Sequence, residues 1–245
     1  MPKIEFFLSS GEVHNSLQGA KVVENKFNVG LDYPPQPAKN FIPEEYKNLI
    51  NYKDNDLRRQ TVKKCIPFLD ALTGGYIIPF FQDYLITVDF ERNSFDVRTT
   101  YGEVAPHSSD QLPDNYQDRV KPIGKFDNKW AIKTPPGYSC LFMHPINTPK
   151  KDFEIISGIV DTDSFEDTIL FPYYIRRHGD KNEKRTQIHI KLGDSMVQVI
   201  PFKRESWTSS SKINKEEEVG RFRSKWGGRL FDTYKKMYWH KKDYK

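Results

Sequence analysis

Alternating apolar and polar residues predict that most of this chain is β-structure. Residues 84–90 (YLITVDF) and 94–100 (SFDVRTT) alternate with a period of two, and a loop of hairpin length separates them. They are therefore predicted to pair as a β-hairpin. Further short strands, each bounded by Gly, Pro or other turn residues, are predicted at residues 3–8, 129–133, 138–143 and in three runs within 152–202. This succession favours a mainly β fold, a rolled β-sandwich or β-clip-like barrel, over alternating strands and helices.

One or two short helices are expected between residues 40 and 80. Residues 42–50 place a proline at a first helical position with two Glu behind it, and their apolar side chains share one face. Residues 61–72 form the second candidate helix, which Pro67 is expected to interrupt. Residues 1–204 are thus predicted to form one β-rich domain that carries these helices as an embellishment.

The last part of the chain, residues 205–245, is predicted to be a polar linker followed by a basic amphipathic helix over 219–245. Residues 221–245 hold 9 Lys/Arg and 2 Asp/Glu, a net charge of +7, so the rest of the chain carries −2 of the total of +5. One face of this helix is apolar and is a candidate for binding a second subunit or another partner: Phe222, Trp226, Leu230, Tyr234 and Trp239. The alternatives are packing on the protein's own body, binding of nucleic acid by the basic tail, and an anionic membrane surface.

Composition allows a sizeable core and argues against several classes of protein. Apolar residues are only 37% of the chain, but 17 Phe, 13 Tyr and 4 Trp provide large buried areas. Cys65 and Cys140 are too far apart in the sequence for a disulfide framework or a zinc motif, and both are expected to be reduced thiols in the cytoplasm. Cys140 lies in an apolar run and is expected to be a small buried hydrophobe. No apolar run approaches the length of a transmembrane helix, and the N-terminal residues do not resemble a signal peptide.

Two carboxylates at a strand end are the first candidate for chemistry. Asp161 and Asp163 follow the apolar run at 155–160, and residues two apart in a strand point to the same face. As a catalytic pair they would share a proton, hold a divalent cation or orient a water molecule. The alternative is a turn in which each Asp accepts hydrogen bonds from backbone amides.

A metal site is the second candidate. His144, Asp161 and His189 lie at or near predicted strand ends in the same half of the chain. Together they would make a two-His, one-carboxylate triad for a non-haem iron or a similar divalent metal. However, His189 lies in an alternating run with Ile on both sides, which places it on the exposed face of its strand.

Five separated blocks resemble an uncharacterised protein family of tailed bacteriophages that has distant bacterial relatives. The blocks are FIPEEYK (41–47), KKCIPFLDALTGGYIIP (63–79), KTPPGYSCLFMHPIN (133–147), GIVDTDSF (158–165) and GDSMVQVIPFKR (193–204). This resemblance implies a viral or bacterial source and a place in the host cytoplasm or the virion. It implies no activity.

Three of these segments also resemble the trimeric dUTPases and dCTP deaminases, which are β-rich enzymes. By that likeness Asp161 would correspond to the Asp that helps to position the catalytic water and the sugar in those enzymes. Gln198 would correspond to the Gln of their closing G-D-x-x-A-Q motif. The sequence departs from those enzymes where the residues from His144 to Asn147 replace their phosphate-binding Arg-Ser-Gly segment, and Phe165 falls one residue late for their stacking aromatic.

Three functions follow as expectations. The first is a non-catalytic protein that holds a small polar molecule, such as a nucleotide, in a β-rolled pocket. Asp161 and Asp163 would line this pocket, together with Tyr138, His144, Asn147 and Gln198. The second is an enzyme, either a nucleotide hydrolase or a non-haem metal enzyme. The third is a structural or interaction protein, in the virion or as a homo-oligomer, that docks through its C-terminal helix.

Overall fold

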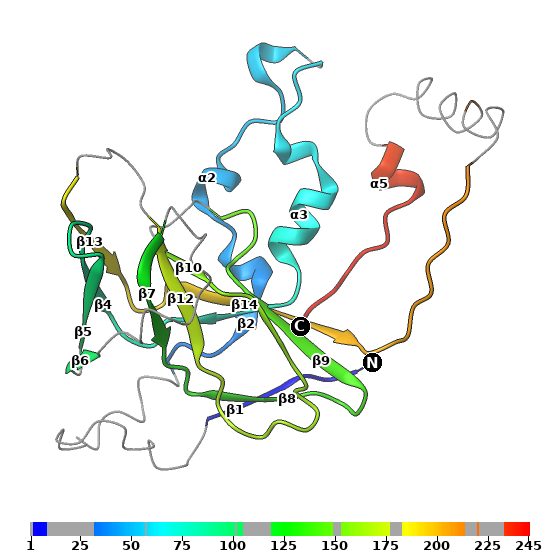
Figure 1. Ribbon diagram of the computed structural model, residues 1–245. Coiled ribbons are helices and arrows are strands. Elements are labelled where there is room, and N and C mark those ends of the chain that lie inside the picture. Colours follow the sequence, from blue (N-terminus) through cyan, green and yellow to red (C-terminus); the bar gives the residue numbers. More distant parts are fainter. Residues whose placement is uncertain are drawn as a thin grey trace.

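A computed structural model describes residues 2–8, 32–56, 58–100, 102–104, 119–148, 153–176, 183–213, 220 and 233–245, and it is mainly β (Figure 1). All strand pairs within the described residues are antiparallel. The largest sheet has five strands in the order β11 (Gly158–Val160), β9 (Tyr138–Met143), β14 (Ser195–Lys203), β3 (Tyr76–Pro79) and β2 (Gln36–Pro37).

Three smaller sheets complete the described strands. A four-stranded sheet has the order β13 (Arg185–Ile190), β4 (Tyr84–Asp89), β5 (Ser94–Thr99) and β6 (Gly102–Val104). A three-stranded sheet has the order β10 (Phe153–Ile155), β12 (Phe171–Arg176) and β7 (Arg119–Phe126). A two-stranded ribbon pairs β1 (Glu5–Leu8) with β8 (Trp130–Lys133). The predicted mainly β fold is confirmed as a sandwich-like arrangement of sheets, and these sheets do not close into a barrel.

The predicted hairpin at 84–100 is confirmed by the β4–β5 pair. Tyr84 pairs with Thr99 and Asp89 with Ser94. The four-residue loop between the strands, residues 90–93, contains Asn93 at φ 51°, a left-handed conformation that Asn adopts more readily than most residues. The alternation places Ile86, Val88, Phe95 and Val97 in the core.

Short helices occupy the region between β2 and β3, as predicted, with different bounds. They are η1 (Ala38–Phe41), α2 (Glu44–Lys47), η2 (Lys53–Asn55), η3 (Val62–Lys64) and α3 (Ile66–Thr73). The expected break at Pro67 is wrong, because this proline lies in the first turn of α3. Backbone N–H groups in the first turn have no intrahelical partner, so a proline there removes no helical hydrogen bond. No helix among the described residues has the length and apolarity of a membrane span.

The C-terminal helix ends earlier than predicted. Within the described part of the tail, α5 covers Thr233–Met237, and the chain from Trp239 to Lys245 has no helix or strand. The prediction of helix up to residue 245 is therefore wrong. These last residues contact the body through side chains, and such tertiary contacts override the helical spacing of the sequence.

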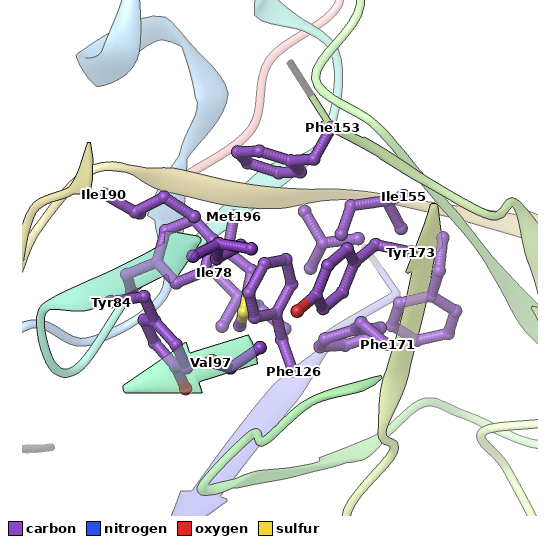
Figure 2. Packing of buried hydrophobic residues seen from close by; sticks show 14 of the residues in the cluster. Ile78, Tyr84, Val97, Phe126, Phe153, Ile155, Phe171, Tyr173, Ile190 and Met196 are labelled. Atoms are coloured by element: carbon purple, nitrogen blue, oxygen red, sulfur yellow. The ribbon is translucent and has the colours of Figure 1, made fainter. Parts of the chain in front are cut away.

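An aromatic cluster at the junction of the sheets forms the centre of the core (Figure 2). The rings of Phe126 and Tyr173 stack with their centroids 3.8 Å apart and their planes 13° apart. Phe126 also makes edge contacts to three further buried rings, those of Phe80 at 4.8 Å, Tyr84 at 5.1 Å and Phe153 at 5.4 Å. These residues come from different sheets, so the Phe126 ring of β7 packs against side chains from more than one sheet.

Gly124 makes this stack possible. It pairs with Tyr173 across β7 and β12, and a Cβ atom at Gly124 would lie 2.2 Å from Cζ of the buried tyrosine ring. Tyr173 therefore lies across the backbone of Gly124 to reach Phe126. A larger residue at this position would displace the ring at the centre of the core.

We expect Gly124→Ala to destabilise the protein by about 2–3 kcal/mol, as overpacking of a tight core typically does. Urea denaturation followed by circular dichroism measures the change. Gly158→Ala is the matched control, since Gly158 is an exposed strand glycine with no atom within 4 Å of the added Cβ. Equal stabilities of the two variants would contradict the role assigned to Gly124.

Candidate functional site

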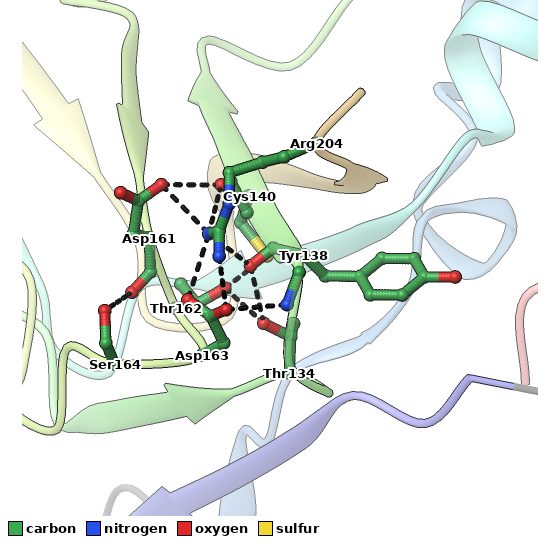
Figure 3. Close-up of polar contacts among 10 residues, drawn as sticks. Thr134, Tyr138, Cys140, Asp161, Thr162, Asp163, Ser164 and Arg204 are labelled. Carbon is green, nitrogen blue, oxygen red and sulfur yellow. Dashed lines mark hydrogen bonds and ion pairs between the residues drawn. The ribbon is translucent and has the colours of Figure 1, made fainter. Parts of the chain in front are cut away.

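Asp161 and Asp163 converge on one guanidinium group, that of Arg204 (Figure 3). The two Asp follow β11, Arg204 follows β14, and the start of β9 lies between them, so three neighbouring strands of the five-stranded sheet supply the cluster. The backbone N–H of Arg204 donates to the carbonyl of Gly137 at 2.8 Å. This bond extends the β9–β14 pairing by one residue and positions the arginine beside the carboxylates.

The carboxylates converge although the strand does not continue. The backbone N–H groups of Ser164 and Phe165 donate to the carbonyl of Asp161 at 3.1 and 2.9 Å, so the chain turns directly after β11. The assumption of a continuous strand is thus wrong, yet both carboxylates reach the same cation. Nη1 of Arg204 lies 2.9 Å from Oδ1 of Asp163 and 3.2 Å from Oδ1 of Asp161, and its Nη2 also contacts Asp163.

Electrostatics make Asp163 a permanent anion near neutral pH. Its side chain is only 10% exposed. Hydrogen bonds from Arg204, and then from the backbone N–H of Gly137 at 2.8 Å, lower the pKa of Asp163 to about 2. The same pairing raises the pKa of Arg204. Asp163 therefore holds no proton to share, and its amide contact matches the alternative predicted for it, a carboxylate that stabilises a turn.

Asp161 is more open to solvent, with 62% of its side chain exposed. One of its oxygens accepts a hydrogen bond from the Ser139 hydroxyl at 2.6 Å, and that hydroxyl accepts a bond from Arg204 at 3.0 Å. The carboxylate is thus held by a serine and an arginine of the two neighbouring strands. This arrangement joins the ends of β9, β11 and β14.

Behind the carboxylates lies a buried network of hydroxyl and thiol groups. The hydroxyls of Thr134 and Thr162 are 2.8 Å apart, and the Thr162 hydroxyl donates to Sγ of Cys140 at 3.3 Å. Burial raises the pKa of the Cys140 thiol to about 11. Because only the thiolate is a nucleophile, Cys140 is inert, as expected for a small buried hydrophobe. Cys65, by contrast, is exposed, and both thiols are free.

Gln198 is buried and fully engaged within the protein. Its Nε2 donates to the carbonyls of Ala71 at 3.0 Å and Gly74 at 2.6 Å, and its Oε1 accepts from the backbone N–H of Ile146 at 2.8 Å. These bonds join β14 to the end of α3 and to the turn after β9. Both N–H donors and the oxygen of the amide side chain thus have backbone partners, so Gln198 has a structural role.

His144 and Asn147 lie beside Gln198, in the turn that follows β9. Nδ1 of His144 accepts a hydrogen bond from the backbone N–H of Ile155 at 3.4 Å. Asn147 has φ 58° and donates from its side chain to the carbonyl of Phe68 in α3 at 3.3 Å. These contacts attach the turn to the neighbouring strand and helix.

The six residues predicted to line one pocket therefore form two groups. In the pairing of β9 with β14, Tyr138 lies opposite Lys203 and Met143 opposite Gln198. The two ends of β9 are about 17 Å apart at roughly 3.4 Å per residue. Asp161 and Asp163 lie near the Tyr138 end, whereas the other three predicted residues lie at the Met143 end. The ring of Tyr138 also points away from the carboxylates (Figure 3).

The predicted metal triad does not assemble. His189 lies on β13 in the four-stranded sheet, where it is exposed and pairs with Leu85, while His144 and Asp161 flank different ends of β9. Among the described residues, no three His, Cys, Asp or Glu side chains are grouped as a metal ion requires. The three strand ends belong to different parts of the sandwich, which sequence spacing alone does not reveal.

Residues near the C-terminus contact helix α3 through a carboxylate that the sequence analysis did not single out. Asp70 of α3 accepts hydrogen bonds at 2.9 and 3.1 Å from the indole N–H of Trp239. Nζ of Lys242 lies 2.6 Å from the same carboxylate. The sequence did offer one indication that this residue has a partner, since Asp70 is the single acidic residue in the apolar helix sequence IPFLDALT. Trp239 and Tyr234 are half-buried, whereas Phe222, Trp226 and Leu230 lie outside the described residues.

Residues 239–245, here called the C-terminal segment, make further contacts to the body. The rings of Tyr244 and Tyr76 meet edge to face at 5.9 Å, and the Tyr76 hydroxyl donates to the carbonyl of Lys245 at 3.3 Å. Asp243 lies 3.9 Å from Nζ of Lys39 in η1. For this segment, the structure therefore shows packing on the protein's own body, which was one of the alternatives considered for the tail.

Residues 204–213, here called the arm, connect the sheet to the tail. Each residue of the arm is exposed, and the arm has neither helix nor strand. The Trp207 residue is 86% exposed and Ile213 is fully exposed. The arm runs away from β14, and the C-terminal segment runs back towards the body (Figure 1).

Comparison of the chain with protein-family models, with curated proteins and with solved structures finds no significant match.

We expect the pKa of Asp163 to rise from about 2 towards the ordinary aspartate value in Arg204→Met, because the guanidinium contributes most to the depression. A carboxyl-detected NMR titration measures this shift. Lys203→Met is the matched control, since Lys203 pairs with Glu205 and not with Asp163.

The lowered pKa of Asp163 makes the unfolding free energy depend on pH in a definite direction. The pKa in the folded state lies below the value of about 3.9 of an unfolded chain. The interaction therefore stabilises the fold above about pH 4, and this contribution is lost as the pH falls to about 2. The unfolding free energy of the wild type should consequently fall more steeply over this range than that of Arg204→Met. Parallel pH profiles would contradict the proposed pairing.

Proposed function

We propose that this protein is a structural subunit that assembles with copies of itself through its arm. The observation that carries the proposal is the exposure of Trp207 and Ile213 within ten consecutive exposed residues. Tryptophan is the residue most enriched among those that dominate binding energy at protein interfaces. A single exposed aliphatic residue is ordinary. An indole on a segment that leaves the body is well placed to be covered by another chain.

The magnitude of the expected contact supports self-association. Burying one Trp removes roughly 150–250 Å² from water, which stabilises by about 4–6 kcal/mol at ~25 cal/mol per Å². In a symmetric pair each copy contributes one Trp207, so the gain is about 8–12 kcal/mol. This is comparable with the loss of translational and rotational freedom, about 4–15 kcal/mol. Burial of Ile213 and of neighbouring arm residues adds to the gain.

The polar residues that suggested a ligand pocket have structural partners in the chain. Arg204 neutralises Asp163, and Gln198 makes three hydrogen bonds to backbone groups. Using them for a ligand would require breaking hydrogen bonds that join β14 to its neighbours. The exposed side chains of Trp207 and Ile213 require no such change, and so an assembly role is better supported than ligand binding.

The source and location of the subunit belong to the same proposal. The blocks FIPEEYK (41–47) and GDSMVQVIPFKR (193–204), together with the three between them, resemble the tailed-bacteriophage family. This resemblance supports an accessory or structural role in an infected bacterium, in the host cytoplasm or in the virion. A self-assembling subunit with an exposed arm fits such a role.

Size-exclusion chromatography with multi-angle light scattering tests the proposal. At tens of micromolar we expect the wild type to have at least twice the mass of one chain. The dissociation constants of modest interfaces lie in roughly this concentration range. The variant Trp207→Ser/Ile213→Ser should have the mass of a single chain. Ile50→Ser is the matched control, because Ile50 is also an exposed isoleucine but lies outside the arm.

Two outcomes would overturn this function. One is a wild type that remains a single chain throughout the concentration range. The other is a double variant that assembles as well as the wild type. Circular dichroism of each variant confirms that the fold is retained, which is expected because the substituted side chains do not contribute to the core.

A further inference from the structure

We infer that the C-terminal segment is exchanged between copies, so that residues 239–245 of one chain dock on Asp70 and Tyr76 of another. This inference rests on the proposed function, and it names the contact that would hold the assembly together. The docking surface consists of α3, η1 and β3. Its occupant is a defined peptide of this chain, and the contacts it makes are present in the structure.

The docking contacts are specific and depend only on the last residues of the chain. The Asp70 carboxylate receives both the Trp239 indole N–H and the Lys242 ammonium group. It is about four-fifths buried, with 19% of the side chain exposed, and charge-assisted bonds to such a carboxylate are stronger than neutral ones. At the other end, Tyr76 engages the Tyr244 ring and the carbonyl of Lys245. Indole, ammonium and phenol groups thus meet a complementary surface.

The chain between the sheet and this peptide permits exchange. Arm residues 205–213 span about 30 Å when extended, at roughly 3.3 Å per residue. A folded chain of this length has a radius of gyration of roughly 18 Å. The arm alone is therefore long enough to carry the following residues to a neighbouring body. Nothing in the docked contacts depends on the peptide and Asp70 belonging to the same chain.

Reciprocal exchange retains each docking contact and covers the arm. Identical segments exchanged between identical chains reproduce the same contacts, which is why such exchange forms dimers at a low cost in free energy. In an exchanged pair the two arms run past each other between the bodies, and Trp207 and Ile213 then have a partner surface. An unexchanged chain leaves both side chains in water, as observed here. Exchange thus accounts for the exposed arm and the docked segment together.

Complementation between two variants tests the inference. Asp70→Asn retains a hydrogen-bond acceptor but has no carboxylate, and Lys242→Arg retains the charge but has no primary amine. A carbodiimide joins a carboxylate to a contacting amine as an amide, and the carbodiimide is converted to a urea. In the wild type this reagent should join Asp70 to Lys242, which lie 2.6 Å apart. Neither variant alone can form this bond.

The two full-length variants are co-expressed with tags of different length and treated with the carbodiimide. In an exchanged heterodimer, one of the two junctions has Asp70 from the Lys242→Arg chain beside Lys242 from the Asp70→Asn chain. We expect a covalent heterodimer whose cross-linked peptides contain residues 70 and 242. The exposed pair Glu91–Lys184, 2.7 Å apart within the body, is the internal standard and should be joined only within a chain.

The outcomes separate this inference from the proposed function. A co-expressed sample that is oligomeric by light scattering but forms no interchain 70–242 bond, while the wild type forms that bond within one chain, would overturn exchange and leave self-assembly standing. A sample that contains single chains only would overturn both. Loss of the oligomer after deletion of residues 239–245, with Trp207 and Ile213 intact, would be the second result in favour of exchange.

Discussion

The stack of Tyr173 on Phe126 is the contact on which the rest of the structure depends. It brings together rings from several sheets whose strands are far apart in the sequence, and it exists only because Gly124 has no side chain. With about 37% apolar residues, the chain cannot rely on many aliphatic side chains. A few large rings in edge and stacked contacts provide the buried area instead.

Around that core, the polar residues mainly join strands and helices. Arg204 ties the ends of three strands through two carboxylates, and Gln198 ties the same sheet to the helices through three backbone groups. Leaving the side chain of Arg204 or Gln198 without hydrogen-bond partners at these sites would destabilise the fold, and both side chains find partners within the chain. Among the described residues, the two most exposed large apolar side chains, Trp207 and Ile213, are on the arm. The proposed self-assembly therefore uses the periphery of the protein, and its interior polar groups serve the fold.

Much of the fold could be predicted from the sequence, because alternation is a local property. The β4–β5 hairpin, the short helices between β2 and β3 and the buried position of Cys140 all follow from periodicity or composition. The bounds of the helices could not, since Pro67 fits a first turn as well as it breaks a helix interior. The end of α5 at Met237 also depends on contacts to distant residues, such as Asp70.

The candidate site shows where such reasoning fails. That Asp161 and Asp163 would point to one place was predicted, but the cation between them was not, since Arg204 is distant in the sequence and follows a different strand. Tyr138 and Gln198 were expected to line one pocket, and their strands, β9 and β14, do lie side by side in the sheet. Which end of β9 each residue occupies depends on strand register, which a single sequence does not specify.

The central claim is that the arm is covered when copies of the chain assemble. Hydroxyl-radical footprinting across a range of protein concentrations tests it most directly, with buried Trp130 and exposed Ile50 as internal references. We expect oxidation of Trp207 and Ile213 to fall as the concentration rises, while oxidation of the two references stays constant. Oxidation of Trp207 that is independent of concentration, in a sample shown to be oligomeric, would contradict the account.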